Sequence, residues 1–451
     1  MTEFTDFQPD ALYYIPLGGC GEFGKNLSLY GWNGHWLMVD LGISFHSENH
    51  PPGTLIMPDI SWIEKRRKAL AGLIITHAHE DHIGAVCYLW PRLRCPVYAT
   101  PFAAAFLRAK LRDNNMDYDL ELIEINPGET FYVGPYHCRV APITHSIPES
   151  TMVEIKTNHG RIVHTGDWKL DHVPSVGDAY DASIYDEMGR DGVLLAVSDS
   201  TNANIPGRSG DEIDVEEGLT RLFSRLPHRI LVTCFASNVG RIKSIARAAA
   251  ANGRRVILAG RSLWRFSHIA RDLGYYDDIE KFDGPKEMRR HARKQTVIIC
   301  TGSQGETNAA LSRIAMGQHP KISPIPGDHV VFSSRIIPGN EEEIALLQDQ
   351  LRHAAQEVIT PADVPETIYS SGHPCADEVA QLYTWLKPQK VMPVHGTTAH
   401  QQANEEIARR CGVSDVLVPA NGQVIRVAPG PLTVVGEVPH GIVAAQPEEY
   451  A

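Results

Sequence analysis

The sequence predicts an α/β protein built from more than one structural unit, and three observations support this fold class. The chain has 451 residues, roughly three times the length of a typical single domain. Apolar, β-branched runs alternate along it with stretches of helical spacing. The composition, 43% apolar and 21% charged residues, is that of an ordinary globular protein.

The first clear alternation is the stretch 70–93. Residues 70–77 (LAGLIITH) form an apolar run typical of a buried strand. After a tight loop, residues 80–93 (EDHIGAVCYLWPRL) have helical spacing, which we expect to end at Pro91. This strand, loop and helix arrangement places any polar side chains of the loop at the carboxyl end of a strand.

The second alternation lies between residues 229 and 303. Three predicted strands (RILVTCFASN, RRVILAG and QTVIICTGS) are separated by two predicted helices (VGRIKSIARAAAANG and SLWRFSHIARDLG). Strands that alternate with helices indicate a parallel sheet.

Composition and termini exclude several classes of protein. No apolar run is long enough to cross a membrane, and the first residues lack the basic start and apolar centre of a signal peptide. We therefore expect a cytoplasmic protein with no membrane partner. The eight cysteines form no CxxC pair, which argues against a zinc ribbon and favours buried thiols.

The loop after residues 70–77 carries the motif HxHxDH, formed by His77, His79, Asp81 and His82. Histidine nitrogens and carboxylates are ligands that Zn²⁺ prefers. His77 and His79 alternate by two and share a side, while Asp81 and His82 come from the following turn. They can therefore face a second ion.

A site with two metals needs more ligands than this loop supplies. Three other residues follow apolar runs in the same way: His145, Asp167 and His395. Any one of them alone would more often be an ordinary loop residue. Their recurrence together with HxHxDH predicts a binuclear site, whereas His159, His164 and His400 are expected in supporting or surface positions.

These residues resemble the ligands of the metallo-β-lactamase superfamily, whose αββα sandwich holds two metals at its strand ends. Across nearly the full chain, ten stretches in order resemble the ribonuclease J family of the β-CASP branch: PLGGCGEFGKN, HAHEDHIGA, THSIPES, HTGDWKLD, SDSTNA, FASNVGR, TGSQGE, SSRIIPGNE, SGHP and PVHG. The fold implied is a metallo-β-lactamase αββα sandwich with an inserted β-CASP α/β domain. The usual C-terminal domain of the family is not expected, and the oligomeric state is left open, with a homodimer as one alternative.

The resemblance implies a ligand set of seven residues. One metal would be held by His77, His79 and His145, the other by Asp81, His82 and His395, with Asp167 bridging them. Asp40 would orient a ligand. The cofactor expected is two Zn²⁺, for which Mn²⁺ or Mg²⁺ can substitute.

The β-CASP branch implies three further residues and a division of the chain. Asp199, His373 and His395 match its motifs. We expect a first part of the metallo-β-lactamase domain at 1–205, the β-CASP domain at 206–365 and the last part of the metallo-β-lactamase domain at 366–451.

The charge distribution singles out the inserted domain. The whole chain carries a net charge of −12, but residues 209–365 hold 21 Lys and Arg against 19 Asp and Glu. A basic surface favours contact with nucleic acid. The candidate phosphate contacts are Arg241, Lys243, Arg254, Arg255, Arg261 and Arg265, although a solvated helix surface explains each equally well.

Two turns are the stronger candidates for RNA contact. By resemblance, FASN (with Phe235, Ser237 and Asn238) and SSGH (with Ser370, Ser371, Gly372 and His373) contact the RNA backbone and its terminal phosphate. Tyr369 replaces a histidine that is common in the family.

The resemblance therefore implies a zinc-dependent ribonuclease in RNA processing and decay, a 5′-to-3′ exonuclease with endonuclease activity as a second mode. Its catalytic residues would be Asp81, Asp167, Asp199 and His373, with His373 as proton donor to the leaving 3′ oxygen. The expected substrate is single-stranded RNA with a 5′-monophosphate. The alternatives are a β-CASP enzyme that acts on DNA, a small-molecule hydrolase, and a catalytically silent RNA-binding paralogue.

Overall fold

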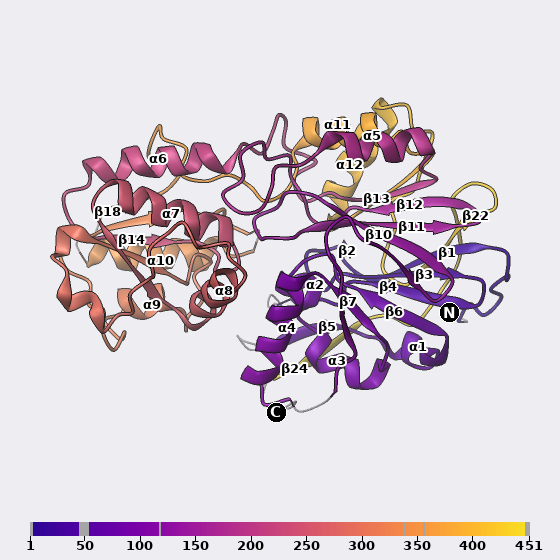
Figure 1. Cartoon of the computed structure of the whole chain (residues 1–451), viewed down its shortest axis with the longest axis horizontal. Helices are drawn as coiled ribbons and strands as arrows, with labels where there is room; N and C mark the ends of the chain where they lie inside the picture. Colours follow the sequence, from indigo (N-terminus) through magenta and orange to yellow (C-terminus); the bar gives the residue numbers. More distant parts are fainter. Residues whose placement is uncertain (1–2, 45–53, 117–118, 338, 355–356, 447–451) are drawn as a thin grey trace.

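The structure is a computed structural model, which describes residues 3–44, 54–116, 119–337, 339–354 and 357–446. Figure 1 shows a layered unit that contains most of the strands and a smaller α/β unit beside it. Within the described residues, no helix is both long and apolar enough to span a bilayer.

The layered unit contains two large sheets. The first has the strand order β23-β22-β1-β3-β4-β6-β7-β8, and the second β21-β19-β13-β12-β11-β10-β9. The bounds in the first sheet are β1 Leu12–Gly18, β3 Leu27–Trp32, β4 His35–Val39, β6 Leu70–Ile74, β7 Val97–Ala99, β8 Leu122–Glu124, β22 Gln423–Ala428 and β23 Thr433–Glu437. Those in the second are β9 Thr130–Val133, β10 Tyr136–Pro142, β11 Thr151–Thr157, β12 Gly160–His164, β13 Leu195–Asp199, β19 Lys390–Val394 and β21 Asp415–Val416.

Apolar side chains on both faces of each sheet explain the layers. In β1, Leu12 and Tyr14 point into the core between the two sheets, whereas Tyr13 and Ile15 point into the core under the outer helices. Successive side chains of a strand alternate between faces, so a strand that is apolar throughout requires cover on both sides.

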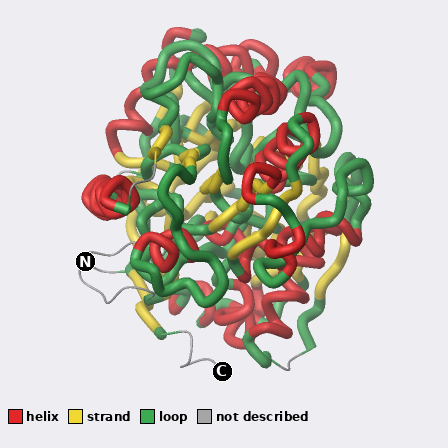
Figure 2. The backbone as a smooth tube through the Cα atoms, turned by 90° about the vertical axis from the view of Figure 1, so that its left-hand side faces the viewer, coloured by secondary structure: helices red, strands yellow, loops and turns green. Residues whose placement is uncertain are grey.

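Helices supply that cover on the two outer faces, and Figure 2 shows the strands enclosed between them. The first sheet packs against α1 Ser61–Glu64, α3 Val86–Leu93 and α4 Pro101–Asp113. The second packs against α5 Ala182–Asp191, α11 Ala376–Leu386 and α12 Thr398–Arg410. The predicted αββα sandwich is confirmed.

Two short ladders complete this unit. One pairs β2 Cys20–Gly21 with β20 Gly396–Thr397, and the other pairs β5 Leu55–Pro58 with β24 Ile442–Ala445. The first of them lies directly beside His395 and joins the amino-terminal loop to the carboxyl end of β19.

The smaller unit is the inserted α/β unit, whose sheet has the order β15-β16-β14-β17-β18 with every pair parallel. The strands are β14 Ile230–Thr233, β15 Arg255–Ala259, β16 Thr296–Cys300, β17 His329–Phe332 and β18 Glu357–Ile359. The helices are α6 Glu212–Arg225, α7 Val239–Ala251, α8 Arg261–Asp272, α9 Ala310–Ala315 and α10 Glu341–His353. The predicted parallel sheet is confirmed. The three expected strands are β14 at its centre, β15 at one edge and β16 between them.

The chain leaves the second sheet after β13 and returns to it in β19, and a buried carboxylate ties the two crossings together. Glu378 of α11 is fully buried. It accepts hydrogen bonds from the backbone N–H groups of Leu170, Ser209 and Cys375 and from the Ser209 hydroxyl. One side chain therefore holds both ends of the inserted segment.

Glu378→Ala should lower the apparent melting temperature by roughly 5 °C, because it leaves several buried donors without an acceptor. Differential scanning calorimetry measures this. Glu406→Ala, at an exposed position of α12, is the matched control and should have little effect. Equal melting temperatures for the two variants would contradict the role given to Glu378.

Candidate functional site

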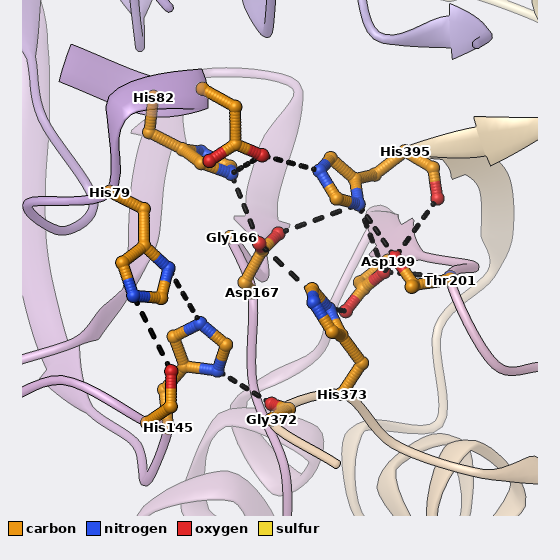
Figure 3. Close-up of polar contacts among 12 residues, drawn as sticks. His79, His82, His145, Gly166, Asp167, Asp199, Thr201, Gly372, His373 and His395 are labelled. Carbon is orange, nitrogen blue, oxygen red and sulfur yellow. Dashed lines mark hydrogen bonds and ion pairs between the residues drawn. The ribbon is translucent and has the colours of Figure 1, made fainter. Parts of the chain in front are cut away.

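The predicted ligands meet at one edge of the sandwich, where strands of both sheets end. His77 and His79 follow β6, His145 follows β10, Asp167 follows β12 and His395 follows β19. Because β12, β13 and β19 run parallel, their carboxyl ends lie at the same edge. Figure 3 shows the side chains of His79, His145, Asp167 and His395 pointing toward one another.

The helix expected over residues 80–93 is divided in the structure. A single turn, α2 Glu80–Ile83, carries Asp81 and His82 and is separated from α3 Val86–Leu93. The expectation that the helix ends at Pro91 is wrong, since α3 continues to Leu93. Proline removes one backbone donor there, but the last turn is fixed by buried side chains such as Leu93.

Contacts from distant segments cause this division. The carbonyl of Asp81 accepts bonds from the backbone and the side chain of Asn26, and the N–H of Ala85 donates to Leu41 at 3.0 Å. A Cβ added at Gly42 would lie 1.6 Å from the Asp81 oxygen, so only glycine permits this approach. The turn that carries two predicted ligands is therefore held by the amino-terminal loops.

The first cluster consists of His77, His79, His145 and Asp167, whose donor atoms lie within 4.8 Å of one another. His145 Nδ1 is 2.5 Å from the Gly372 carbonyl, which only accepts, so Nδ1 carries the hydrogen and Nε2 has the lone pair. Nε2 of His77 is buried and has no hydrogen-bond partner among the described residues. Burial lowers the pKa values of His77 and His145 well below the usual range, which keeps both rings neutral.

The second cluster consists of Asp81, His82, Asp167 and His395. Asp40 is buried and contacts His82 Nδ1 at 2.7 Å. The other ring nitrogen of His82, Nε2, faces Asp167 at 3.1 Å. His395 Nε2 lies 3.2 Å from Asp81 Oδ2. The structure thus places Asp40 in contact with His82, one of the predicted ligands.

These two donor sets fit metal ions. Both combine imidazole nitrogens with carboxylate oxygens, and they share Asp167. A buried imidazole nitrogen such as His77 Nε2, with no partner of its own, is costly unless a cation occupies the space in front of it. The clusters are able to hold metal ions by the chemistry of their donors.

Asp199 and His373 form a pair next to the second cluster. Asp199 Oδ2 is 2.9 Å from His373 Nδ1, and Asp199 Oδ1 is 3.4 Å from His395 Nδ1. Burial would raise the pKa of Asp199, but His373 outweighs it and lowers this pKa to about 2. Burial would lower the pKa of His373, yet the carboxylates of Asp199 and Asp167 raise it. The two carboxylates therefore favour the protonated form of His373.

A polar cavity opens beside His145, between the sandwich and the inserted unit. Ser370, Ser371, Gly372 and Asn238 line it. Asn238 also caps α7, because its Oδ1 accepts a bond from the backbone N–H of Arg241 at 2.8 Å. Of the predicted substrate-binding residues, Phe235 and Ser237 are half-buried and do not line this cavity.

The basic residues proposed as phosphate contacts mostly have other partners. Arg241 is fully buried and forms a two-point ion pair with Glu212, and Lys243 binds Asp278 at 2.8 Å. Arg254 donates to backbone carbonyls, Arg255 pairs with Asp283 and Arg265 with Asp113. Only Arg261, of these six, is exposed without such a partner among the described residues. Five of the six candidates therefore have partners within the protein, which are carboxylates for four of them and backbone carbonyls for Arg254.

Sequence reasoning missed three residues of the site. Thr201 donates to Asp199 at 2.7 Å, Asn202 donates to Ser371 at 2.7 Å, and Arg335 of the inserted unit contacts Asn202. All three lie within the stretches SDSTNA and SSRIIPGNE, but their residue types alone give no signal of a site.

The comparisons with known proteins agree with this architecture. Residues 35–188 match the β-lactamase superfamily domain, residues 227–351 the β-CASP domain of ribonuclease J, and residues 364–419 the Zn-dependent metallo-hydrolase RNA specificity domain. A crystal structure of a protein of unknown function from Enterococcus faecalis V583 superposes with a TM-score of 0.66 at 15% identity, covering 92% of this chain and all of that one. It supports the fold alone.

Fold and site together define a metallo-hydrolase of the metallo-β-lactamase superfamily with a β-CASP insertion. The chain is 42% identical over 438 residues to ribonuclease J of Sinorhizobium meliloti, covering 96% of this chain and 77% of the relative. It is 38% identical to the ribonucleases J of Mycolicibacterium smegmatis and Corynebacterium glutamicum, and covers 78% and 60% of their lengths. The chain belongs to the ribonuclease J family of metal-dependent nucleases.

Proposed function

We propose that the protein is a zinc-dependent ribonuclease that hydrolyses single-stranded RNA from a 5′-monophosphate end, with internal cleavage as a second mode. The observation that supports this best is the pair of donor clusters that share Asp167, next to a polar cavity lined by the SSGH turn. His77, His79, His145 and Asp167 would hold one zinc ion, and Asp81, His82, His395 and Asp167 the other. Mn²⁺ or Mg²⁺ would substitute.

Zinc ions, when bound, supply Lewis acidity that activates water and neutralises phosphate charge during hydrolysis. The chain's own residues supply orientation and protons. The Asp167 carboxylate, buried between the two clusters, aligns the attacking water, and Asp81 adds a second carboxylate at the same edge. His373, held at Nδ1 by Asp199, donates a proton from Nε2 to the leaving 3′ oxygen. The products are a 5′-phosphate and a 3′-hydroxyl.

In this proposal the terminal phosphate of the RNA binds at the cavity beside His145, which Lys169, Asp171 and Glu212 also line. Ser370, Ser371 and Gly372 line it, and the Lys169 ammonium group lies 3.3 Å from the Ser370 hydroxyl and 2.9 Å from Asp171. A phosphate held there fixes how far the RNA reaches, so the first scissile bond is positioned by binding rather than by sequence. Phe235, Ser237 and Asn238 of FASN would contact the following nucleotides.

Other expectations belong to the same proposal. We take the sandwich to comprise residues 1–205 and 366–451 and the β-CASP unit residues 206–365. The protein would act in the cytoplasm, with a homodimer as its proposed oligomeric state. Sedimentation velocity at nanomolar and micromolar concentrations measures that oligomeric state.

The purified protein should degrade RNA with a 5′-monophosphate fastest and release mononucleotides, because a 5′-hydroxyl leaves the cavity donors unpaired and a triphosphate is too large. A chelator should stop cleavage, and zinc should restore it. The measurement uses 5′-labelled RNA with each end and DNA of matched sequence. Equal cleavage of DNA would favour a β-CASP DNA nuclease, RNA binding without cleavage a silent paralogue, and fragments from internal sites alone an endonuclease.

A further inference from the structure

Arg335 extends from the inserted unit to the edge of the candidate site. It follows β17, and its Nη1 donates a hydrogen bond to Oδ1 of Asn202, which follows β13 of the sandwich. The loop around it is fixed, because the Gln304 side chain donates to the Arg335 carbonyl at 2.8 Å and accepts from Ile337 N–H at 2.8 Å. Within the described part of the chain, Arg335 forms no ion pair with a carboxylate, unlike most arginines of this unit.

The contact with Arg335 determines which way the Asn202 amide faces. A guanidinium group only donates, so the amide oxygen must face Arg335. The amide nitrogen then faces the opposite way, where it donates to Ser371 Oγ at 2.7 Å and to the His373 carbonyl at 3.2 Å. One hydrogen bond from the inserted unit thus fixes two donors that face the SSGH turn.

These donors determine what the Ser371 hydroxyl can do. Its oxygen accepts from Asn202 Nδ2 and also from the backbone N–H of His373 at 3.1 Å. A hydroxyl has two lone pairs and one hydrogen, so the hydrogen is left to be donated. Ser371 lines the polar cavity. Within the protein, the phenol oxygen of Tyr369 also lies near this hydroxyl. Burial raises the pKa of Tyr369, and a hydrogen bond with Ser371 lowers it.

We propose that Arg335 and Asn202 are positioning residues for 5′-end specificity: together they hold Ser371 as a hydrogen-bond donor to the terminal phosphate. The inference rests on the proposed function, since it assumes that the SSGH turn binds that phosphate. Because Arg335 belongs to the inserted unit and Asn202 to the sandwich, the donor is aligned only when the two units are packed together.

Arg335→Met should lower the ratio of kcat/KM on 5′-monophosphate RNA to kcat/KM on 5′-hydroxyl RNA by about tenfold, approaching the ratio of Ser371→Ala. Arg335→Lys should restore most of the ratio, because an ammonium group also only donates. Fluorescence anisotropy with phosphorothioate RNA bearing either 5′ end should show the same loss in affinity. Arg313→Met, an exposed arginine on α9, is the matched control.

Asn202→Asp provides the sharper test, because it keeps an acceptor for Arg335 but removes the donors to Ser371. The new carboxylate would accept the Ser371 hydrogen, so the 5′-end preference should fall although the contact with Arg335 becomes ionic. An unchanged preference in Arg335→Met and Asn202→Asp, with loss in Ser371→Ala, would overturn the inference and leave the proposed function standing. A wild-type protein with no 5′-end preference would overturn both.

Discussion

Asp167→Asn should reduce kcat on 5′-monophosphate RNA by at least about a thousandfold and lower the zinc bound per chain. Asp167 belongs to both donor clusters, with its Oδ2 3.1 Å from His82 Nε2 and 3.9 Å from His77 Nε2. Asparagine has the same size but no charge, so the packing remains while the carboxylate shared by the two clusters is lost. Single-turnover kinetics and mass spectrometry of bound zinc measure the two effects.

The folded state of this variant is checked by its melting temperature in the presence of chelator, which should stay close to that of the wild type. Asp186→Asn, at a partly exposed position of α5 whose carboxylate pairs only with Arg190 among the described residues, is the matched control and should keep both activity and zinc. Wild-type turnover by an Asp167→Asn protein that holds no zinc would show that the clusters do not carry the chemistry.

The donor residues were predictable because each follows a strong local pattern. His77 and His79 follow a buried strand, and His145, Asp167 and His395 follow others. Sheet geometry then brings the carboxyl ends of such strands to one edge. The alternation of β14, α7, β15, α8 and β16 was equally visible, because each element is long or strongly apolar.

Features that depend on distant contacts were not predictable. The break between α2 and α3 is caused by Asn26 and Gly42, which approach Asp81 from the amino-terminal loops. β18 was not expected either: it is a three-residue edge strand, with too few side chains to show a pattern.

Charge gave the least reliable signal. A count of basic residues cannot show that Arg241 is fully buried against Glu212. Nor can it single out Arg335, whose contact Asn202 lies 133 residues away in the chain. Only the folded structure distinguishes an arginine used in an ion pair from one available at the site.

His373→Ala should reduce kcat on RNA by roughly a hundredfold to ten-thousandfold, the usual range for loss of a general acid. The leaving 3′ oxygen then departs without a proton, which is the costly step. RNA that contains a single 3′-phosphorothiolate linkage tests this cause directly, because a thiolate leaves well unprotonated. The variant should therefore lose much less activity on that linkage than on the natural one, as measured by single-turnover cleavage at saturating zinc.

The pH profile distinguishes a proton donor from a residue that only supports the loop. Burial would lower the pKa of His373, but Asp199, 2.9 Å away, and Asp167 raise it. The protonated ring is the active form, so wild-type kcat should fall as pH rises through this raised pKa. Asp199→Asn removes a carboxylate that holds the proton, and the fall should move to lower pH; in His373→Ala it should disappear. Suppose instead that His373→Ala loses equal activity on the natural and phosphorothiolate linkages and keeps the fall of kcat at high pH. His373 would then be a positioning residue, because a group that transfers no proton cannot make the rate depend on the leaving group.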